Sequence, residues 1–291
     1  MRQEFEFYRP QTLKEMSRII SEGTCRVIAG GTDLIPQLRK DIVSTPVLVD
    51  ISRLADLRFI EEQNGWIRIG ALSTQSELET SQLLQSCAPL LSTAAGSIGC
   101  PQTRNRATLG GNLANASPAA DTIPPLLVLD AEVILLSSKG ERNIPLDKFL
   151  LGPSKIACAP DEIIHSITFP VLPDSFGMSF RKLGKRKGMA IAIVSVAVAL
   201  SVDKTGILND VRIALGSVAP KAVRSPHVEE ILINQVPNPD LLQQASEAVL
   251  NDIQPISDIR SSAVYRQHAA VHLLNQALQE ALKKTNERSA A

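Results

Sequence analysis

Two glycine pairs are the residues of this chain whose type and spacing favour ligand chemistry. Gly30–Gly31 directly follows the short apolar run Cys25–Ala29, and Gly110–Gly111 lies in a second short segment further along. Paired glycines let successive main-chain N–H groups converge on a phosphate, because no Cβ atom obstructs the approach. Thr32 and Asn112 add one polar side chain to each pair. We interpret the pairs as two halves of one anion-binding site, although a tight turn is the alternative for either pair alone.

Other reactive residues lack the spacing that metal or nucleophilic chemistry needs. The four cysteines are Cys25, Cys87, Cys100 and Cys158. They form no C-x-x-C pair, so neither a zinc site nor an iron–sulfur cluster has its usual ligand spacing. His268 and His272 stand four residues apart without a third ligand, which indicates a solvated helix face rather than a metal site. No G-x-G-x-x-G fingerprint, P-loop or Ser-His-Asp arrangement is present in the sequence.

The composition excludes several partners. Thirty basic and thirty acidic residues cancel, which argues against a nucleic-acid surface or a polybasic membrane patch. The basic run at 181–187 is interpreted as a solvated, charged turn for most of its side chains. The apolar stretch 189–202 is shorter than the ~20 residues that span a bilayer. The start of the chain lacks the apolar core of a secretory signal, so we expect a cytoplasmic protein with free thiols.

The hydrophobic pattern places the first glycine pair inside a β-α-β unit. A helix is predicted over 12–21, with Thr12 as its N-cap, followed by a strand over 25–29. A short helix over 33–40 and a buried strand over 46–50 complete the unit, and the glycines occupy its first crossover.

The second glycine pair lies among predicted helices. These span 75–85, 88–96 and 121–130, the last with Asp121 as its cap and two prolines in its opening turn. Strands are predicted over 66–72, 131–136 and 163–169.

Beyond these strands, a proline-punctuated stretch marks a domain boundary near residue 173. It is followed by a hairpin with limbs at 193–202 and 207–218, although a buried helix is the alternative for the first limb. Two helices over 241–250 and 261–284 close the chain. The second carries an apolar stripe that should pack on a sheet, formed by Val264, Val271, Leu274, Leu278 and Leu282.

Longer stretches around these features resemble a known family. The segment 97–107, which runs into the second glycine pair and on to Asp121, resembles the FAD-binding subunit of the molybdenum hydroxylases. Xanthine and carbon monoxide dehydrogenases belong to that family. The segments 180–186, 191–197 and 258–266 are similar to its C-terminal domain, whereas 188–190 lacks the acidic residue that relatives commonly carry there.

The resemblance implies an α+β fold with two domains. Residues 1–173 would form an FAD-binding domain of the vanillyl-alcohol-oxidase (PCMH) type, with lobes at about 1–55 and 56–173. Residues 174–291 would form a smaller α+β domain that closes over the flavin.

The resemblance also implies non-covalent FAD and assigns its contacts. The expected cofactor-binding residues are Val27, Ile28, Ala29, Gly30, Gly31, Thr32, Asp33, Leu34, Ile98, Thr108, Leu109, Gly110, Gly111, Asn112, Asp121, Ile164 and Lys182. Both glycine segments would supply N–H donors to the pyrophosphate, and Asp121 would accept from hydroxyl groups. A lysine at 182 would stabilise negative charge on the reduced flavin. For Ile98 and Ile164, core packing is the alternative. No catalytic residue and no metal ligand is expected in this chain.

As a function, the resemblance implies electron transfer. The chain would take electrons from a [2Fe-2S] subunit, itself supplied by a molybdopterin subunit, and pass them to a terminal acceptor. A dimer of heterotrimers is the expected assembly. One alternative is a stand-alone FAD-dependent oxidase or dehydrogenase acting on its own small substrate. Another is an assembly subunit that has lost the flavin, against which both intact glycine pairs argue.

Overall fold

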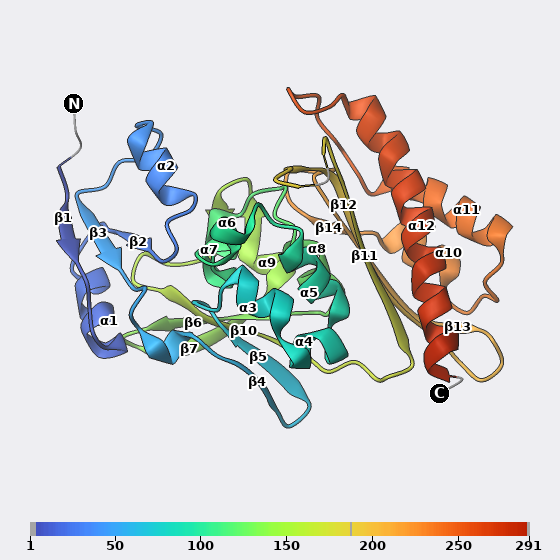
Figure 1. Ribbon diagram of the computed structural model, residues 1–291, viewed down its shortest axis with the longest axis horizontal. Coiled ribbons are helices and arrows are strands. Elements are labelled where there is room, and N and C mark those ends of the chain that lie inside the picture. Colours follow the sequence, from blue (N-terminus) through green and yellow to red (C-terminus); the bar gives the residue numbers. More distant parts are fainter. Residues whose placement is uncertain (1–3, 187, 290–291) are drawn as a thin grey trace.

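The computed structural model describes residues 4–186 and 188–289, with side chains described up to residue 285. Helices and strands are mixed along the whole described chain, so the predicted α+β class is confirmed (Figure 1). The strands form sheets of three, five, four and two strands. Lys187 of the predicted charged turn lies outside the described residues.

The first sheet is the predicted β-α-β unit extended by one strand. Its strands are β1 (Glu6–Tyr8), β2 (Arg26–Ile28) and β3 (Val47–Asp50), in the order β1-β3-β2 with parallel pairing. Helix α1 (Leu13–Ser21) precedes β2, and Thr12 accepts a hydrogen bond from the Glu15 N–H, as expected for its N-cap. Helix α2 (Leu34–Arg39) joins β2 to β3, so the first glycine pair lies in the β2–α2 loop.

The second sheet is antiparallel and carries most of the helices. Its strands are β4 (Ile60–Gln63), β5 (Trp66–Gly70), β6 (Glu132–Ser137), β7 (Gly140–Pro145) and β10 (Ile163–Pro170), in the order β4-β5-β10-β6-β7. The helices of this part are α3 (Gln75–Thr80), α4 (Gln82–Cys87), α5 (Pro89–Gly96), α6 (Pro101–Arg104), α7 (Leu109–Asn115), α8 (Ile123–Val128) and α9 (Leu146–Phe149), with a 3₁₀ turn at Ala55–Leu57. A short hairpin joins β8 (Leu150–Gly152) to β9 (Lys155–Ile156).

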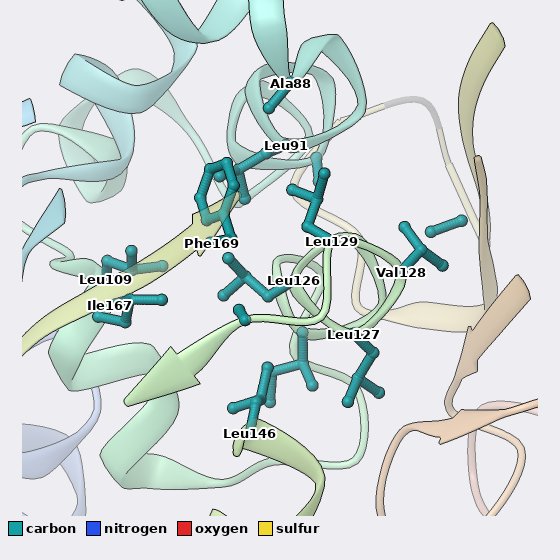
Figure 2. Close-up of a cluster of buried hydrophobic side chains, with 14 of the residues drawn as sticks. Ala88, Leu91, Leu109, Leu126, Leu127, Val128, Leu129, Leu146, Ile167 and Phe169 are labelled. Carbon is teal, nitrogen blue, oxygen red and sulfur yellow. The ribbon is translucent and has the colours of Figure 1, made fainter. Parts of the chain in front are cut away.

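These helices lie between the second sheet and the C-terminal sheet (Figure 1). Figure 2 shows the apolar core there, in which Leu91 of α5 and Leu126 of α8 pack near Phe169 of β10. Burial of these side chains is the main favourable term that holds the helices on the sheet.

One prediction in this part is wrong in detail. The single helix predicted over 75–85 is two short helices, because Ser81 has an extended backbone and its hydroxyl accepts from the Leu84 N–H, which starts α4. The second glycine pair lies in the first turn of α7, whose N-cap is Thr108.

The C-terminal sheet confirms the predicted hairpin. Its antiparallel strands are β11 (Phe176–Gly184), β12 (Ala192–Val202), β13 (Leu208–Gly216) and β14 (Val223–Arg224). Helices α10 (Pro226–Leu232), α11 (Pro239–Ala248) and α12 (Ala263–Ser289) follow, with a 3₁₀ turn at Val249–Asn251. The charged turn predicted over 181–187 is wrong at its start, because Arg181 and Lys182 lie on β11.

Helix α12 packs on β11 and β12, as the apolar stripe predicts. Leu274 and Leu278 are fully buried, whereas Val264 is 60% exposed and does not belong to the buried face. The helix lies so close to the sheet that a Cβ on Gly177 would overlap the carbonyl oxygen of Ala281. Within the described part of the chain, no helix is long and apolar enough to cross a membrane.

Candidate functional site

A cavity of about 690 Å³ lies between the β2–α2 loop and the segments around α6 and α7. This volume falls within the range of roughly 300–1,000 Å³ that is typical of small-molecule sites. The predicted site residues on its wall are Val27, Ile28, Ala29, Gly30, Gly31, Thr32, Asp33, Leu34, Ile98, Thr108, Gly111, Asn112 and Asp121. The structure therefore brings together both glycine pairs and Asp121, which are far apart in the sequence.

The first glycine segment, defined as Ala29–Leu34, offers unused main-chain donors to this cavity. Gly31 has a φ of +71°, a conformation that favours glycine and turns the chain toward the cavity. The N–H groups of Ala29–Leu34 have no hydrogen-bond acceptor among the described residues. Successive free N–H groups in a turn form a concave site for an anion.

The two segments touch at Gly30. A Cβ at this position would overlap the carbonyl oxygen of Arg106, so only glycine permits the contact. The close approach holds the free N–H groups of the first glycine segment beside the start of α7.

In the second glycine segment, defined as Thr108–Asn112, the N–H groups of residues 109–112 already have acceptors. The N–H of Leu109 donates to the Ser73 carbonyl and the N–H of Gly110 to the Ala71 carbonyl, each at 2.9 Å. The next two N–H groups donate to the hydroxyl and the carbonyl of Thr108, at 3.1 and 3.0 Å. The expectation that both segments supply a row of free N–H donors is therefore corrected: four of the five N–H groups of the second glycine segment have acceptors among the described residues.

The glycine at 110 serves packing instead. A Cβ there would lie 2.6 Å from the Ala71 Cβ, so glycine lets α7 approach the end of β5. Leu109 is fully buried, and neither it nor Gly110 is on the cavity wall. The second glycine segment contacts the cavity through Thr108, Gly111 and Asn112.

Asp121 does not cap α8, contrary to expectation. The N-cap is Thr122, which makes no side-chain cap, and the Asp121 carboxylate instead accepts from the Lys182 ammonium at 2.6 Å. Lys182 also donates to the Ser97 carbonyl at 3.0 Å, so it ties β11 to the α5 end and to the residues before α8. A charge–charge partner outcompetes the helix N-terminus for this buried carboxylate.

Burial of Asp121 leaves one oxygen without a partner. Its Oδ1 is buried and has no hydrogen-bond partner among the described residues, although the residue lines the cavity. Burial raises the pKa of the carboxyl from its ordinary 3.8 to about 6, and the Lys182 ammonium opposes this rise. Lys182 itself lies behind Asp121 and is not on the cavity wall.

The two predicted apolar contacts have different positions. Ile98 is half-buried and lines the cavity. Ile164 is buried on β10, where it pairs with Leu135 in the apolar core, and it is not on the wall.

Sequence reasoning missed other wall residues. Gln75, Thr103, Asn115 and Arg260 supply further polar groups to the cavity, and Met189–Ile191 supplies apolar ones. Arg260 and Met189–Ile191 come from loops of the C-terminal part, which therefore borders the cavity. No local pattern distinguishes these residues, because tertiary packing alone brings them to the wall.

Metal-ligating side chains do not gather into a cluster at this cavity or elsewhere in the described chain. The four cysteines are free, and no cluster of three His, Cys, Asp or Glu side chains could hold a metal ion among the described residues. The ring nitrogen Nε2 of His272 lies 2.8 Å from the Gln276 amide nitrogen on the same helix.

Comparison with known proteins decides the family. Residues 3–172 match the model for the FAD binding domain in molybdopterin dehydrogenase, and residues 179–281 match the CO dehydrogenase flavoprotein C-terminal domain. The chain belongs to this flavoprotein family. The resemblance inferred from the sequence is confirmed, and this flavoprotein is an oxidoreductase subunit.

Relatives match over nearly their whole length. A xanthine dehydrogenase FAD-binding subunit from Escherichia coli O157:H7 is 33% identical over 279 residues, 95% of each chain. A glyceraldehyde dehydrogenase medium chain from Sulfolobus acidocaldarius is 32% identical over 278 residues, 95% of this flavoprotein and 98% of the relative. A structure of carbon monoxide dehydrogenase from Hydrogenophaga pseudoflava lacking the Mo-pyranopterin moiety aligns with a TM-score of 0.93 and 29% identity, over 98% and 99% of the two chains.

The residues present fit FAD. A dinucleotide needs N–H donors for its pyrophosphate, and the first glycine segment holds them free of internal acceptors. It also needs acceptors for its hydroxyl groups, and the unpartnered Oδ1 of Asp121 is available at the wall. FAD is thus the cofactor of this flavoprotein.

Proposed function

We propose that this flavoprotein carries FAD as the electron-transfer subunit of a multi-subunit molybdopterin hydroxylase or dehydrogenase. It takes electrons from a [2Fe-2S] subunit and passes them to a terminal acceptor. The observation that carries the proposal is the row of free N–H groups of the first glycine segment, which faces a cavity of suitable volume.

Some of the predicted site residues contact FAD, and others hold the contacting residues in place. The contacts are the residues of the predicted set on the cavity wall, with Gly30, Gly31 and Thr32 at the pyrophosphate and Asp121 at a hydroxyl group. Lys182 positions Asp121 from behind, and Ile164, Leu109 and Gly110 hold the wall in place. When bound, FAD supplies redox chemistry that accepts electrons singly or in pairs.

No residue of this chain acts as acid, base or nucleophile on the substrate. The polar wall groups bind and orient the cofactor, and the loops at Met189–Ile191 and Arg260 cover one side of the cavity. Substrate chemistry therefore belongs to the molybdopterin subunit of the complex.

The assembly is a dimer of heterotrimers, in which separate subunits hold the iron–sulfur clusters and the molybdopterin. The names of the relatives describe FAD-binding subunits and medium chains, which supports a partner-dependent role over a stand-alone oxidase. The intact first glycine segment argues against a subunit that has lost the flavin. Free cysteines are consistent with a cytoplasmic location.

A domain division near residue 173 is supported by the two matched regions, of which the first ends at 172 and the second begins at 179. The linker between β10 and β11 contains Pro173 and falls at this point. Lobes of about 1–55 and 56–173 correspond to the parallel first sheet and the antiparallel second sheet.

Spectroscopy of the purified chain tests the proposal. The chain alone should bind one FAD, seen as a visible flavin spectrum, and should hold no iron or molybdenum. Anaerobic addition of purines, aldehydes or aromatic heterocycles should not bleach the flavin band unless the partner subunits are present. A folded chain that fails to bind added FAD, or bleaching by substrate without partners, would contradict the proposal.

A further inference from the structure

Gln75 is a buried amide whose position is fixed by its neighbours on both sides. It is the first residue of α3 and lies between the two residues of the capping box, in which the Thr74 N–H donates to Glu77 Oε2 at 2.8 Å. The Gln75 N–H donates to the Ala107 carbonyl at 2.8 Å. Gln75 is therefore held at the cavity wall beside the start of the second glycine segment.

Its side chain has no partner of its own. The residue is fully buried, and neither Oε1 nor Nε2 has a hydrogen-bond partner among the described residues. Buried amides in native proteins almost always have partners, because a desolvated donor or acceptor without one is destabilising. Among the described residues with such unpartnered buried atoms, Gln75 and Asp121 are the two on the cavity wall.

The surroundings indicate which part of the ligand Gln75 meets. Gly30 of the first glycine segment packs against the Arg106 carbonyl and the Ala107 nitrogen, and Ala107 is the residue to which Gln75 is bonded. Gln75 thus lies at the junction of the two glycine segments. The polar middle of FAD, where phosphate oxygens and ribityl hydroxyls adjoin, offers acceptors and donors together. A carboxamide is a neutral side chain that can pair with both, through separate donor and acceptor atoms.

We propose that Gln75 is an FAD-binding residue: its Nε2–H donates to a diphosphate oxygen, and its Oε1 accepts from a ligand hydroxyl. The inference rests on the proposed FAD site and extends it by a side chain that no sequence motif identifies. In the FAD-free chain the amide lacks a partner, and FAD binding supplies one.

Substitution of Gln75 distinguishes a role in FAD binding from a purely structural role within the folded chain. Gln75→Met keeps the size of the side chain and removes both polar atoms. We expect the FAD dissociation constant to rise about tenfold, as for a lost hydrogen bond to a charged group. The melting temperature of the FAD-free chain should stay the same or rise, because two unpartnered polar atoms are lost. Gln75→Glu, which brings a carboxylate toward the diphosphate, should weaken FAD binding more than Gln75→Met.

Ser92→Ala is the matched control. The Ser92 hydroxyl is also buried and unpartnered, but it lies on α5 away from the cavity wall, so its loss should leave FAD affinity unchanged. If Gln75→Met does not fold, Gln75→Asn is the second variant. Its side chain is shorter by one methylene, so the amide lies farther from the ligand and FAD binding should weaken in a folded chain. Wild-type affinity in folded Gln75→Met would overturn the inference while FAD binding itself stands. Failure of the folded wild-type chain to bind FAD would instead overturn the proposed function.

Discussion

The two glycine segments look alike in sequence and differ in what their main chains do. In Ala29–Leu34 the N–H groups have no acceptor within the described chain and face the cavity. Within Thr108–Asn112 the N–H groups of residues 109–112 donate to Thr108 and to two carbonyl oxygens just after β5. We therefore propose the first segment as the binding loop, whereas the second is a packed helix start beside it.

This difference shows that a glycine pair in the sequence marks positions without a Cβ. The pair alone does not show whether the space serves ligand binding or close packing. At Gly30 the space admits the Arg106 carbonyl, and at Gly110 it admits Ala71. Both contacts bring two main-chain segments close together. Only the contact at Gly30 belongs to a segment whose N–H donors remain free for a ligand. The predictions below test this distinction, beginning with the largest expected effect.

Gly30→Ala should break the contact between the segments. Its Cβ would overlap the Arg106 carbonyl, so the loop must move away. We expect loss of FAD retention and a fall of about 3 kcal/mol in the free energy of unfolding, measured by denaturant titration. Gly23→Ala is the control, since a Cβ there meets no atom within 4 Å. FAD retention by Gly30→Ala would contradict the account.

Asp121→Asn should remove a pH dependence of stability. Burial raises the folded-state pKa of Asp121 to about 6, above its ordinary 3.8, so folding favours the protonated carboxyl. Its contribution to stability is therefore fully present below pH 3.8 and is lost as pH rises toward 6.

The measurement is denaturant unfolding of the FAD-free wild type and variant across this range. The stability of the wild type relative to the variant should fall by about 2 kcal/mol from pH 4 to pH 6.5. A constant difference between the two proteins would show that burial does not shift this carboxyl.

Thr32→Ala should affect binding without affecting folding. The Thr32 hydroxyl lines the cavity and makes no hydrogen bond within the described chain. We expect the FAD dissociation constant to rise about tenfold and the stability of the FAD-free chain to change by less than about 0.5 kcal/mol. Thr32→Ser should restore affinity. Unchanged FAD titration of Thr32→Ala would remove this side chain from the site.

Thr108→Ala should have the smallest effect, and it should lower stability more than it lowers FAD affinity. Its hydroxyl accepts from the Gly111 N–H as the cap of α7, so its loss should cost about 1 kcal/mol of stability in the FAD-free chain. Loss of FAD affinity should be smaller than for Thr32→Ala. A larger loss of affinity with no loss of stability would reverse the roles assigned to the two segments.

Periodicity and turn residues were sufficient to predict most of the fold. The β-α-β unit around Gly30, the hairpin of β12 and β13, and the packing of α12 all follow from local patterns. The start of α7 does not, because two glycines disfavour a helix and tertiary contacts to Ala71 stabilise it.

Site residues could be predicted only where a local sequence pattern identifies them. The pairing of Asp121 with Lys182 joins residues 61 positions apart, so the local pattern suggested a helix cap instead. Gln75 follows a helix cap, where a polar residue is usually solvated, and only the fold places it on the cavity wall.

Hydrogen–deuterium exchange with and without FAD tests the central claim most directly, because it reports on the main-chain N–H groups of both segments in one experiment. In the FAD-free chain, amides of Ala29–Leu34 should exchange fast and those of Leu109–Asn112 slowly. Added FAD should protect the first set and leave the second almost unchanged. Protection gained at Leu109–Asn112, with none at Ala29–Leu34, would contradict the assignment of the first glycine segment as the FAD-binding loop.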